Sequence, residues 1–285
     1  MKTILSFILL LSGTTLFAQS PDKLHFQLNE ANNMMVDASL NGRDSLKLMF
    51  HLAESEVSLT EAAVARLDSI KLQDGGTANT WGGTHSIKAA TNQQLQIGKW
   101  QWDSLMIFVD RLSGPGSDGK FGPRLFGDHL IELDFTHQLL ILHPQAPDAL
   151  ADYASIPIEM DGNLMFVEVQ SRLGDSLLTH RFMLHSGYGG GLLFDDAFAE
   201  QHQLGEQLTI IKEQKLKDSF GNVLTTKQAI MPGIGIAGLE MEEVLVGFFE
   251  GEIKRQSISV MGMEVLRHFD LIIDPKAATL YLRKG

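Results

Sequence analysis

Two histidines occupy matching places in the sequence and could carry chemistry. His51 lies near the end of an apolar stretch at residues 46–52, and His185 follows the apolar residues 182–184. In each case small or polar residues come next, so each imidazole should stand where a buried strand meets a turn. An imidazole can act as a general base near neutral pH and is a common zinc ligand. The surrounding elements decide which of these roles the geometry allows.

Other readings of these residues are disfavoured by local sequence. The pattern H-E-x-x-H of helical zinc sites is absent. Ser186 adjoins His185, but neighbours in an extended chain point in opposite directions, and no G-x-S-x-G elbow surrounds it. Surface or capping roles are the default for the remaining histidines, apart from His85: His25, His129, His137, His143, His180, His202 and His268.

Strand patterns dominate the chain. Alternating or continuously apolar stretches predict strands at 35–40, 46–52, 105–109, 164–169, 244–249 and 271–273. Asn41-Gly42 and Asp161-Gly162 predict hairpin turns. Helical patterns cover only 59–67, 194–202 and 264–268. The mixture indicates a mostly β protein.

Two glycine-rich stretches resemble phosphate-binding motifs. Residues 233–238 read G-I-G-I-A-G, but a proline precedes them and a strand pattern follows, so a hairpin turn is favoured over a dinucleotide site. Residues 188–191 read Y-G-G-G and lack the Lys-Ser/Thr of a P-loop, which favours a tight turn where backbones pass closely.

An internal repeat spans most of the chain. Phe121-Gly122 recurs 140 residues later as Met261-Gly262, and Trp81-Gly82 recurs 139 residues later as Phe220-Gly221. The segment around His51 recurs around His185 after 134 residues. Landmarks that keep one order and nearly one spacing predict two homologous lobes, joined by residues 145–155. If the lobes pair about a pseudo-twofold axis, the two imidazoles should face each other.

Composition excludes several classes of protein. The 285-residue chain is 44% hydrophobic and carries a net charge of −12, so nucleic-acid binding is disfavoured. It has no cysteine, which excludes disulfides, thiol catalysis and cysteine-ligated zinc. A positive start, an apolar stretch and Leu-Phe-Ala predict a cleaved secretory signal at residues 1–18. No later segment is long and apolar enough to span a bilayer.

The repeat, the corners, the aromatic–Gly pairs and the ending MGMEVLRHFDLIIDPKAATLYL together resemble pepsin/retropepsin-like aspartyl proteases, and are most similar to the secreted two-lobed bacterial type. The resemblance implies two homologous β-barrel-like lobes around a central cleft, at residues 19–148 and 149–285. In that family each corner reads Asp-Thr/Ser-Gly, and the two carboxyl groups share a proton to activate water. A flap closes over the substrate.

This sequence departs from the family at the positions that carry the chemistry. The corners read His51-Leu52-Ala53 and His185-Ser186-Gly187, so both aspartate positions hold histidine. The resemblance places binding residues at the flap positions Trp81 and Gly82, at their counterparts Phe220 and Gly221, and at Phe121 and Met261 of the psi-loops.

The expected function is therefore a secreted or periplasmic pseudoprotease that binds a peptide, a protein segment or another extended ligand in its cleft. We expect a monomer with no cofactor, no metal, no nucleic acid and no membrane partner. Two enzyme readings stay open. One is a hydrolase that uses His51 and His185, with or without a metal that His85 could help to hold. The other is residual aspartic-type activity, which needs an acid such as Glu54, Glu56, Asp195 or Asp196.

Overall fold

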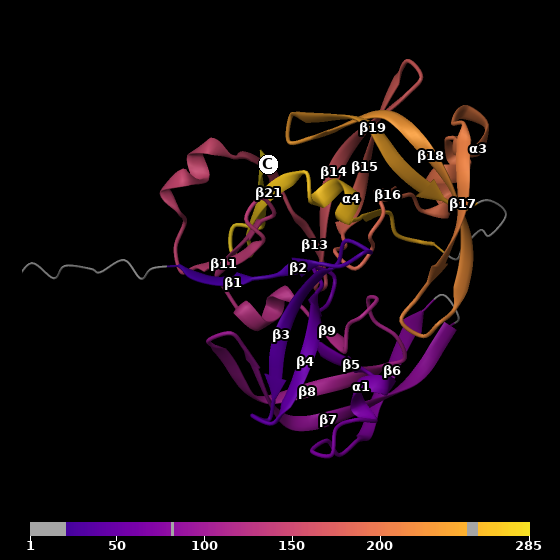
Figure 1. Cartoon of the computed structure of the whole chain (residues 1–285). Helices are drawn as coiled ribbons and strands as arrows, with labels where there is room; N and C mark the ends of the chain where they lie inside the picture. Colours follow the sequence, from indigo (N-terminus) through magenta and orange to yellow (C-terminus); the bar gives the residue numbers. More distant parts are fainter. Residues whose placement is uncertain (1–20, 81–82, 250–255) are drawn as a thin grey trace, which may run out of the picture.

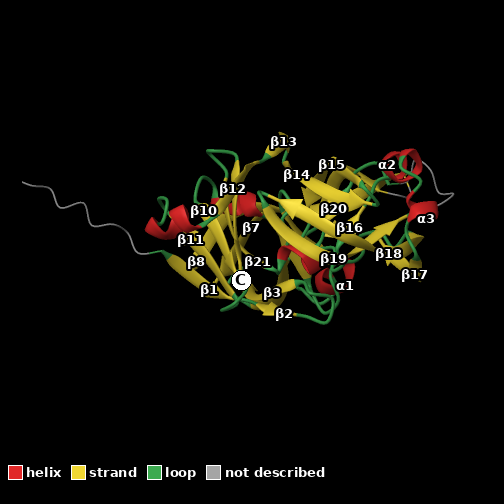
Figure 2. Cartoon of the chain, turned by 90° about the horizontal axis from the view of Figure 1, so that it is seen from above, coloured by secondary structure: helices red, strands yellow, loops and turns green. Residues whose placement is uncertain are grey.

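Two eight-stranded sheets and a third sheet, which pairs strands from both halves of the chain, make up the molecule (Figure 1). The structure, a computed structural model, describes residues 21–80, 83–249 and 256–285. The predicted secretory signal therefore lies outside the described residues, as do Trp81 and Gly82. Strands dominate and the helices are short, as the sequence predicts (Figure 2). No helix of the described part is long and apolar enough to cross a bilayer.

The first eight-stranded sheet is built entirely from the first half of the chain. Its spatial order is β2-β3-β4-β9-β5-β8-β7-β6, and a further β3–β7 pairing closes six of these strands into a barrel. The strands are β2 (Gln27–Leu28), β3 (Met34–Leu40), β4 (Asp44–Phe50), β5 (Val57–Thr60), β6 (Gln73–Thr80), β7 (Gly83–Ile97), β8 (Trp100–Asp110) and β9 (Gly119–Phe121).

The second sheet repeats the first, strand for strand. Its order is β13-β14-β15-β20-β16-β19-β18-β17, in which every label is eleven higher than in the first sheet, and β14–β18 closes the barrel. The strands are β13 (Glu159–Asp161), β14 (Leu164–Leu173), β15 (Ser176–Leu184), β16 (Leu192–Leu193), β17 (Ile210–Lys217), β18 (Val223–Ile236), β19 (Leu239–Phe248) and β20 (Val260–Met261). We call the two barrels lobe one and lobe two. The repeat predicted from sequence is thus a repeat of topology.

The third sheet joins strands from both halves of the chain. Its order is β1-β11-β10-β21-β22-β12, so β10 of the first half pairs with β21 of the second (Figure 1). The strands are β1 (Asp22–His25), β10 (Leu130–Asp134), β11 (Leu139–His143), β12 (Ala154–Pro157), β21 (Phe269–Asp274) and β22 (Thr279–Lys284). The predicted connector 145–155 holds the short helix η2 (Asp148–Asp152) and the start of β12.

The remaining helices are short and lie at strand ends. They are α1 (Glu61–Val64), η1 (Pro123–Phe126), α2 (Asp196–Gln201), α3 (Leu204–Gln207) and α4 (Met263–Leu266). The helix predicted at 59–67 is shorter than expected, because Leu59 and Thr60 belong to β5 and the Thr60 side chain caps α1. The apolar residues of this stretch belong first to a buried strand and then to one helical turn.

The turn predictions agree with the structure. Asn41 and Gly42 both have positive φ in the three-residue turn at 41–43 between β3 and β4, where the Arg43 N–H donates to the Leu40 carbonyl at 3.0 Å. Ala237 and Gly238 turn between β18 and β19, so the G-x-G-x-x-G stretch is a hairpin. In Y-G-G-G, a Cβ on Gly189 would lie 2.1 Å from the Ala31 carbonyl oxygen, which fits the predicted close backbone approach.

Candidate functional site at the lobe interface

His51 and His185 are placed by the same construction in each lobe. β4 ends one residue before His51, and β15 ends one residue before His185. The His51 N–H donates to the Phe121 carbonyl and the His185 N–H donates to the Met261 carbonyl, both at 2.9 Å. The short strands β9 and β20 therefore fix where the two corners begin.

The structure brings the two imidazoles together across the lobe interface. Their ring centroids are 4.4 Å apart, with the planes at 76° to each other. His51 is buried, with 7% of its surface exposed, and His185 is partly buried. The His51 ring lies directly on the second corner, because a Cβ on Gly187 would be 2.2 Å from His51 Nε2. A glycine at position 187 makes room for the imidazole of the other lobe.

Both imidazoles are held in the neutral form. Burial lowers the pKa of His51 well below its usual value, and the neighbouring His185 and Lys120 lower it further. Burial, and then the charge of Lys120, lower the pKa of His185 to about 4. The buried Nδ1 atom of each ring has no hydrogen-bond partner among the described residues. The site is therefore a pair of uncharged rings at neutral pH.

One hydroxyl group links the two corners. Ser186 Oγ donates to the Phe50 carbonyl at 2.9 Å and accepts from the Leu52 N–H at 2.8 Å. Leu52, the equivalent residue of the first corner, has no hydroxyl and is buried as part of the core. The buried Asn33 side chain adds a brace from lobe one by donating to the Ser186 carbonyl at 3.2 Å.

A partly buried cation stands beside the histidine pair and was not anticipated from the sequence. Lys120 Nζ lies 3.1 Å from Glu54 Oε2 and 3.0 Å from Asp110 Oδ2, and donates to Ser219 Oγ at 3.1 Å. Burial acts to lower the pKa of Lys120, but the two carboxylates outweigh it and leave the pKa above its usual value. The only hint in the sequence was a lysine before Phe121-Gly122, where the other lobe has Val260.

The acids that could replace an aspartate are engaged elsewhere. Glu54 pairs with Lys120, and Glu56 pairs with Arg124 at the surface. Asp195 caps α2 by accepting from the Phe198 N–H at 2.9 Å. Asp196 is buried and accepts from the Gln256 N–H at 3.0 Å. Each of these carboxylates has a structural partner in lobe one or lobe two.

The comparisons with known proteins agree with this geometry at the level of the fold. No protein-family model and no curated protein sequence matches the chain. Among solved structures, it is similar to the aspartic proteinase from Irpex lacteus, with a TM-score of 0.59 and 12% identity. The match covers 93% of this chain and 98% of that chain. This chain has the two-lobed pepsin-like fold.

Within the pepsin-like fold, the family resemblance predicted from sequence is confirmed only as far as the architecture. The likeness is to an aspartic proteinase, and two barrel-like lobes fit it. Kinship with the secreted bacterial type, and the replacement of a catalytic aspartate pair by His51 and His185, remain predictions.

The predicted binding residues occupy different environments in the pepsin-like fold. Phe121 and Met261 are almost completely buried, and the Phe121 ring packs 5.2 Å from that of Phe50. In the structure, the carbonyl groups of both residues accept the hydrogen bonds that position the two corners. A role for either residue in ligand binding stays a prediction. Phe220 and Gly221 lie at the tip of the β17–β18 hairpin, partly buried.

His85 does not join the histidine pair as a metal ligand. Its ring stacks on Phe220, with centroids 4.9 Å apart and planes at 13°. No group of three or more histidine, cysteine, aspartate or glutamate residues in the described part of the chain could hold a metal ion. The three-histidine version of the hydrolase reading therefore has no support in this arrangement.

A histidine that the sequence assigned to the surface or to a cap lies instead in a polar cluster within lobe two. His180 Nε2 is 2.8 Å from Asp195 Oδ2 and 2.9 Å from Ser259 Oγ. A serine–histidine–aspartate relay needs the acid and the serine on different ring nitrogens. Here both contact the same nitrogen, so the cluster anchors the start of α2.

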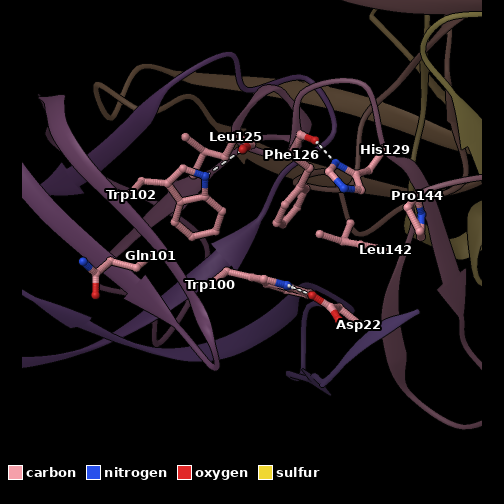
Figure 3. A pocket seen from close by; sticks show the side chains of 9 residues that line it. All are labelled: Asp22, Trp100, Gln101, Trp102, Leu125, Phe126, His129, Leu142 and Pro144. Atoms are coloured by element: carbon pink, nitrogen blue, oxygen red, sulfur yellow. Dashed lines mark hydrogen bonds between the residues drawn. The ribbon is translucent and has the colours of Figure 1, made fainter. Parts of the chain in front are cut away.

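An aromatic cavity of about 250 Å³ lies apart from the histidine pair (Figure 3). The indole N–H of Trp100 donates to Asp22 and that of Trp102 donates to the Leu125 carbonyl, so both rings are fixed in place. The cavity is bounded by β8, η1 and β11 rather than by either corner.

Proposed function

We propose that this chain is a secreted aspartyl-protease-like protein without catalytic activity, whose cleft between the lobes binds a peptide or another extended ligand. The observation that carries the proposal is the neutral imidazole pair at the two corners of a pepsin-like fold. The proposal includes export, which depends on the leader predicted at residues 1–18, and a monomeric state, since one chain supplies both lobes.

The histidine pair is poorly suited to the family's chemistry. Aspartic catalysis uses two carboxyl groups that share one proton, so that one acts as the acid and the other as the base. A general base works best when its pKa lies near the operating pH. Burial lowers the pKa of His185 to about 4 and that of His51 well below its usual value, so both are weak bases at neutral pH.

The fold still offers backbone groups to an extended ligand. β6 and β17 are the last strands of their sheets, so each presents an edge to which a peptide could add as a further strand. The β17–β18 hairpin also reaches lobe one, since the Leu112 N–H donates to the Ser219 carbonyl at 2.7 Å. Such edges favour binding of an extended chain over binding of a compact molecule.

Turnover and binding, measured on the same preparation, test the proposal. The chain is incubated with a mixed peptide library from about pH 3 to about pH 8, a range that spans acid and neutral general-base catalysis. We expect no cleavage at any pH, while library members are retained by the immobilised chain. Cleavage at acid pH that an aspartic-protease inhibitor blocks would contradict the proposal. Zinc-dependent cleavage that disappears in His51→Ala would favour the histidine hydrolase instead.

A further inference from the structure

The tip of the β17–β18 hairpin, residues 218–222, lies on lobe one although the hairpin belongs to lobe two. We call this segment the hairpin tip. In Figure 1 the hairpin runs from lobe two down to the labelled strand β6 of lobe one. The contacts involve Ser219 and Phe220, whose carbonyl oxygens, hydroxyl group and ring all meet lobe-one residues.

The hairpin tip keeps its shape without help from lobe one. Asp218 Oδ1 accepts from the N–H groups of Phe220 and Asn222, both at 2.9 Å. The Gly221 N–H donates to the Asp218 carbonyl at 3.0 Å, and Gly221 has φ of 81°. The turn is therefore closed internally, and Ser219 and Phe220 are presented outwards as a preformed dipeptide.

The face of lobe one that receives the tip has the donors that an extended peptide needs. The Leu112 N–H donates to the Ser219 carbonyl at 2.7 Å, and the Arg111 guanidinium donates to the Phe220 carbonyl at 3.1 Å. Lys120 donates to the Ser219 hydroxyl, and His85 stacks on the Phe220 ring. Two backbone carbonyls, a hydroxyl group and an aromatic ring are thus recognised together.

A cavity of about 350 Å³ continues from the Phe220 ring along the surface of lobe one. Much of its lining is aliphatic, from Val64, Leu72, Ile87 and Val109, with Lys88 and Arg111 supplying positive charge. The receiving face therefore extends beyond the two residues that now cover it, which leaves room for neighbouring residues of a longer ligand.

The hairpin can leave this face as a unit. Among the described residues, Lys227 and later residues of β18 pair with β19, and residues 223–226 pair with β17. β17 ends its sheet and its side chains are mostly exposed. Leu224 and Thr226 of β18 are buried and hold the base of the ribbon on lobe two, with Thr226 Oγ1 donating to the Phe248 carbonyl at 3.0 Å. The part of the ribbon beyond them has no fully buried side chain, and such a segment opens at low free-energy cost.

We propose that lobe one carries a peptide subsite for a hydroxyl residue followed by an aromatic residue, and that Ser219-Phe220 of the same chain occupies it in this structure. The subsite is formed by Arg111, Leu112, Lys120 and His85. It lies beside the histidine pair, because Lys120 directly precedes Phe121, whose carbonyl accepts from the His51 N–H. The inference rests on the proposed function and deepens it by naming the class of peptide.

Competition between the hairpin tip and a matching peptide tests the subsite. The probe is the blocked peptide Asp-Ser-Phe-Gly-Asn, which has the sequence of residues 218–222. Calorimetric titration compares the full chain with its Phe220→Ala variant. If the tip is docked in about nine molecules of ten, freeing the subsite should tighten peptide binding about tenfold. The matched control is Leu177→Ala at the exposed end of the β14–β15 hairpin, which should bind as the unmodified chain does.

Two further measurements identify the residues that bind the peptide. The peptide Asp-Ser-Ala-Gly-Asn should bind the Phe220→Ala chain at least about tenfold more weakly, because it lacks the ring that stacks on His85. Adding His85→Ala to Phe220→Ala should have a similar effect. Hydrogen exchange of the Leu112 amide should be faster in Phe220→Ala than in the unmodified chain, and should slow again when the probe peptide is added.

Equal affinity of the probe for the unmodified and Phe220→Ala chains would overturn the inference, as would no effect of the probe on Leu112 exchange. The outcome is separable from that of the proposed function. If other extended peptides bind without cleavage while the probe does not, the subsite fails and the pseudoprotease proposal stands. If the probe binds but the chain cleaves peptides, the subsite stands and the proposed inactivity fails.

Discussion

The two corners occupy equivalent places in the repeat but are held together in different ways. The second corner keeps Ser186, whose hydroxyl bonds to the backbone on both sides of His51, and Gly187, on which the His51 ring rests. The first corner has Leu52, which is buried in the core, and Ala53, which packs on an apolar cluster of lobe two. One corner therefore supplies the polar link and the other supplies apolar contact.

Behind the corners, polar and apolar contacts are divided the other way round, with the polar contact in lobe one and the apolar contact in lobe two. Behind the first corner, Glu54 pairs with Lys120, a partly buried cation. At the matching positions of the second corner stand Tyr188 and Val260, which belong to the same apolar cluster. Burial raises the pKa of Tyr188 to about 12, so its hydroxyl stays neutral. The two corners have the same topology, yet the first is supported from behind by an ion pair and the second by apolar packing. Each lobe therefore supplies the kind of contact that the other lobe lacks at that place.

The largest expected effect comes from exchanging the small residues of the two corners. Gly187→Ala puts a methyl group 2.2 Å from His51 Nε2, so we expect it to lower the free energy of unfolding by about 3 kcal/mol. Ala53→Gly in the first corner should cost only about 1 kcal/mol, from lost packing and added chain entropy. Urea denaturation of the two variants measures both values.

A double variant shows whether the imidazole is the cause. His51→Ala removes the ring that meets the new methyl group, so adding it to Gly187→Ala should restore most of the lost stability. Additive losses in the double variant would mean that Gly187 is needed for its backbone alone, and the contrast with Ala53 would then lose its basis.

A smaller effect is expected from the hydroxyl that links the corners. Ser186→Ala leaves the Phe50 carbonyl and the Leu52 N–H without that partner in a buried setting, which should cost about 2 kcal/mol. Ser176→Ala, at an exposed hairpin end in the same lobe, is the matched control and should change stability very little. Equal losses for the two variants would show that the polar link contributes no more than a surface hydroxyl.

The effect that is smallest near neutral pH is a pH dependence that separates His185 from a carboxylate of the same lobe. The folded pKa of His185 is about 4 and its unfolded value is 6.5, so the unfolded chain binds more protons between these values. The His185 contribution is complete above about pH 6.5 and is lost as the pH falls towards 4, by about 1 kcal/mol near pH 6 and by about 3 kcal/mol at pH 4. The unfolding free energy as a function of pH should lose this component in His185→Asn.

Asp195 provides the contrast for that measurement. Burial acts to raise its pKa, but hydrogen bonds from His180, the Phe198 N–H and Ser259 outweigh it and lower the pKa to about 2. Its contribution is therefore present above about pH 3.8 and is lost only below that value. Asp195→Asn should leave the slope between about pH 4 and about pH 6.5 unchanged, and a change of slope there would contradict the assignment to His185.

The sequence predicted the architecture because the architecture is repeated. Matching landmarks such as Phe121-Gly122 and Met261-Gly262 keep their order, and in the structure Phe121 and Met261 end the matching strands β9 and β20. The approach of His51 to His185 was expected for the same reason, since a pseudo-twofold axis relates equivalent positions. The turn at Asn41-Gly42 could also be predicted, because its signal lies in two adjacent residues.

Features that only one lobe has could not be predicted from the repeat. Lys120 meets Glu54, Asp110 and Ser219 through contacts between residues far apart in sequence, and its counterpart Val260 gives no hint of them. The docking of Phe220 on His85 depends on how far a two-stranded ribbon extends from lobe two. The contacts of Ser219 and Phe220 depend on the relative placement of the lobes, and the pairing of Lys120 with Glu54 and Asp110 depends on how lobe one folds. Local sequence patterns encode neither.

The third sheet, which pairs strands from both halves of the chain, has a consequence for the order of folding. β10 pairs on one side with β11, five residues further along the chain, and on the other with β21, which starts at Phe269. The first pairing needs only a short loop, whereas the second closes a loop of more than a hundred residues and is entropically slower to form. During synthesis, lobe one can collapse early, but strand β10, which follows it in the chain, must wait with an open edge until Phe269 and the residues after it have been made. That interval is when the nascent protein is most exposed to aggregation.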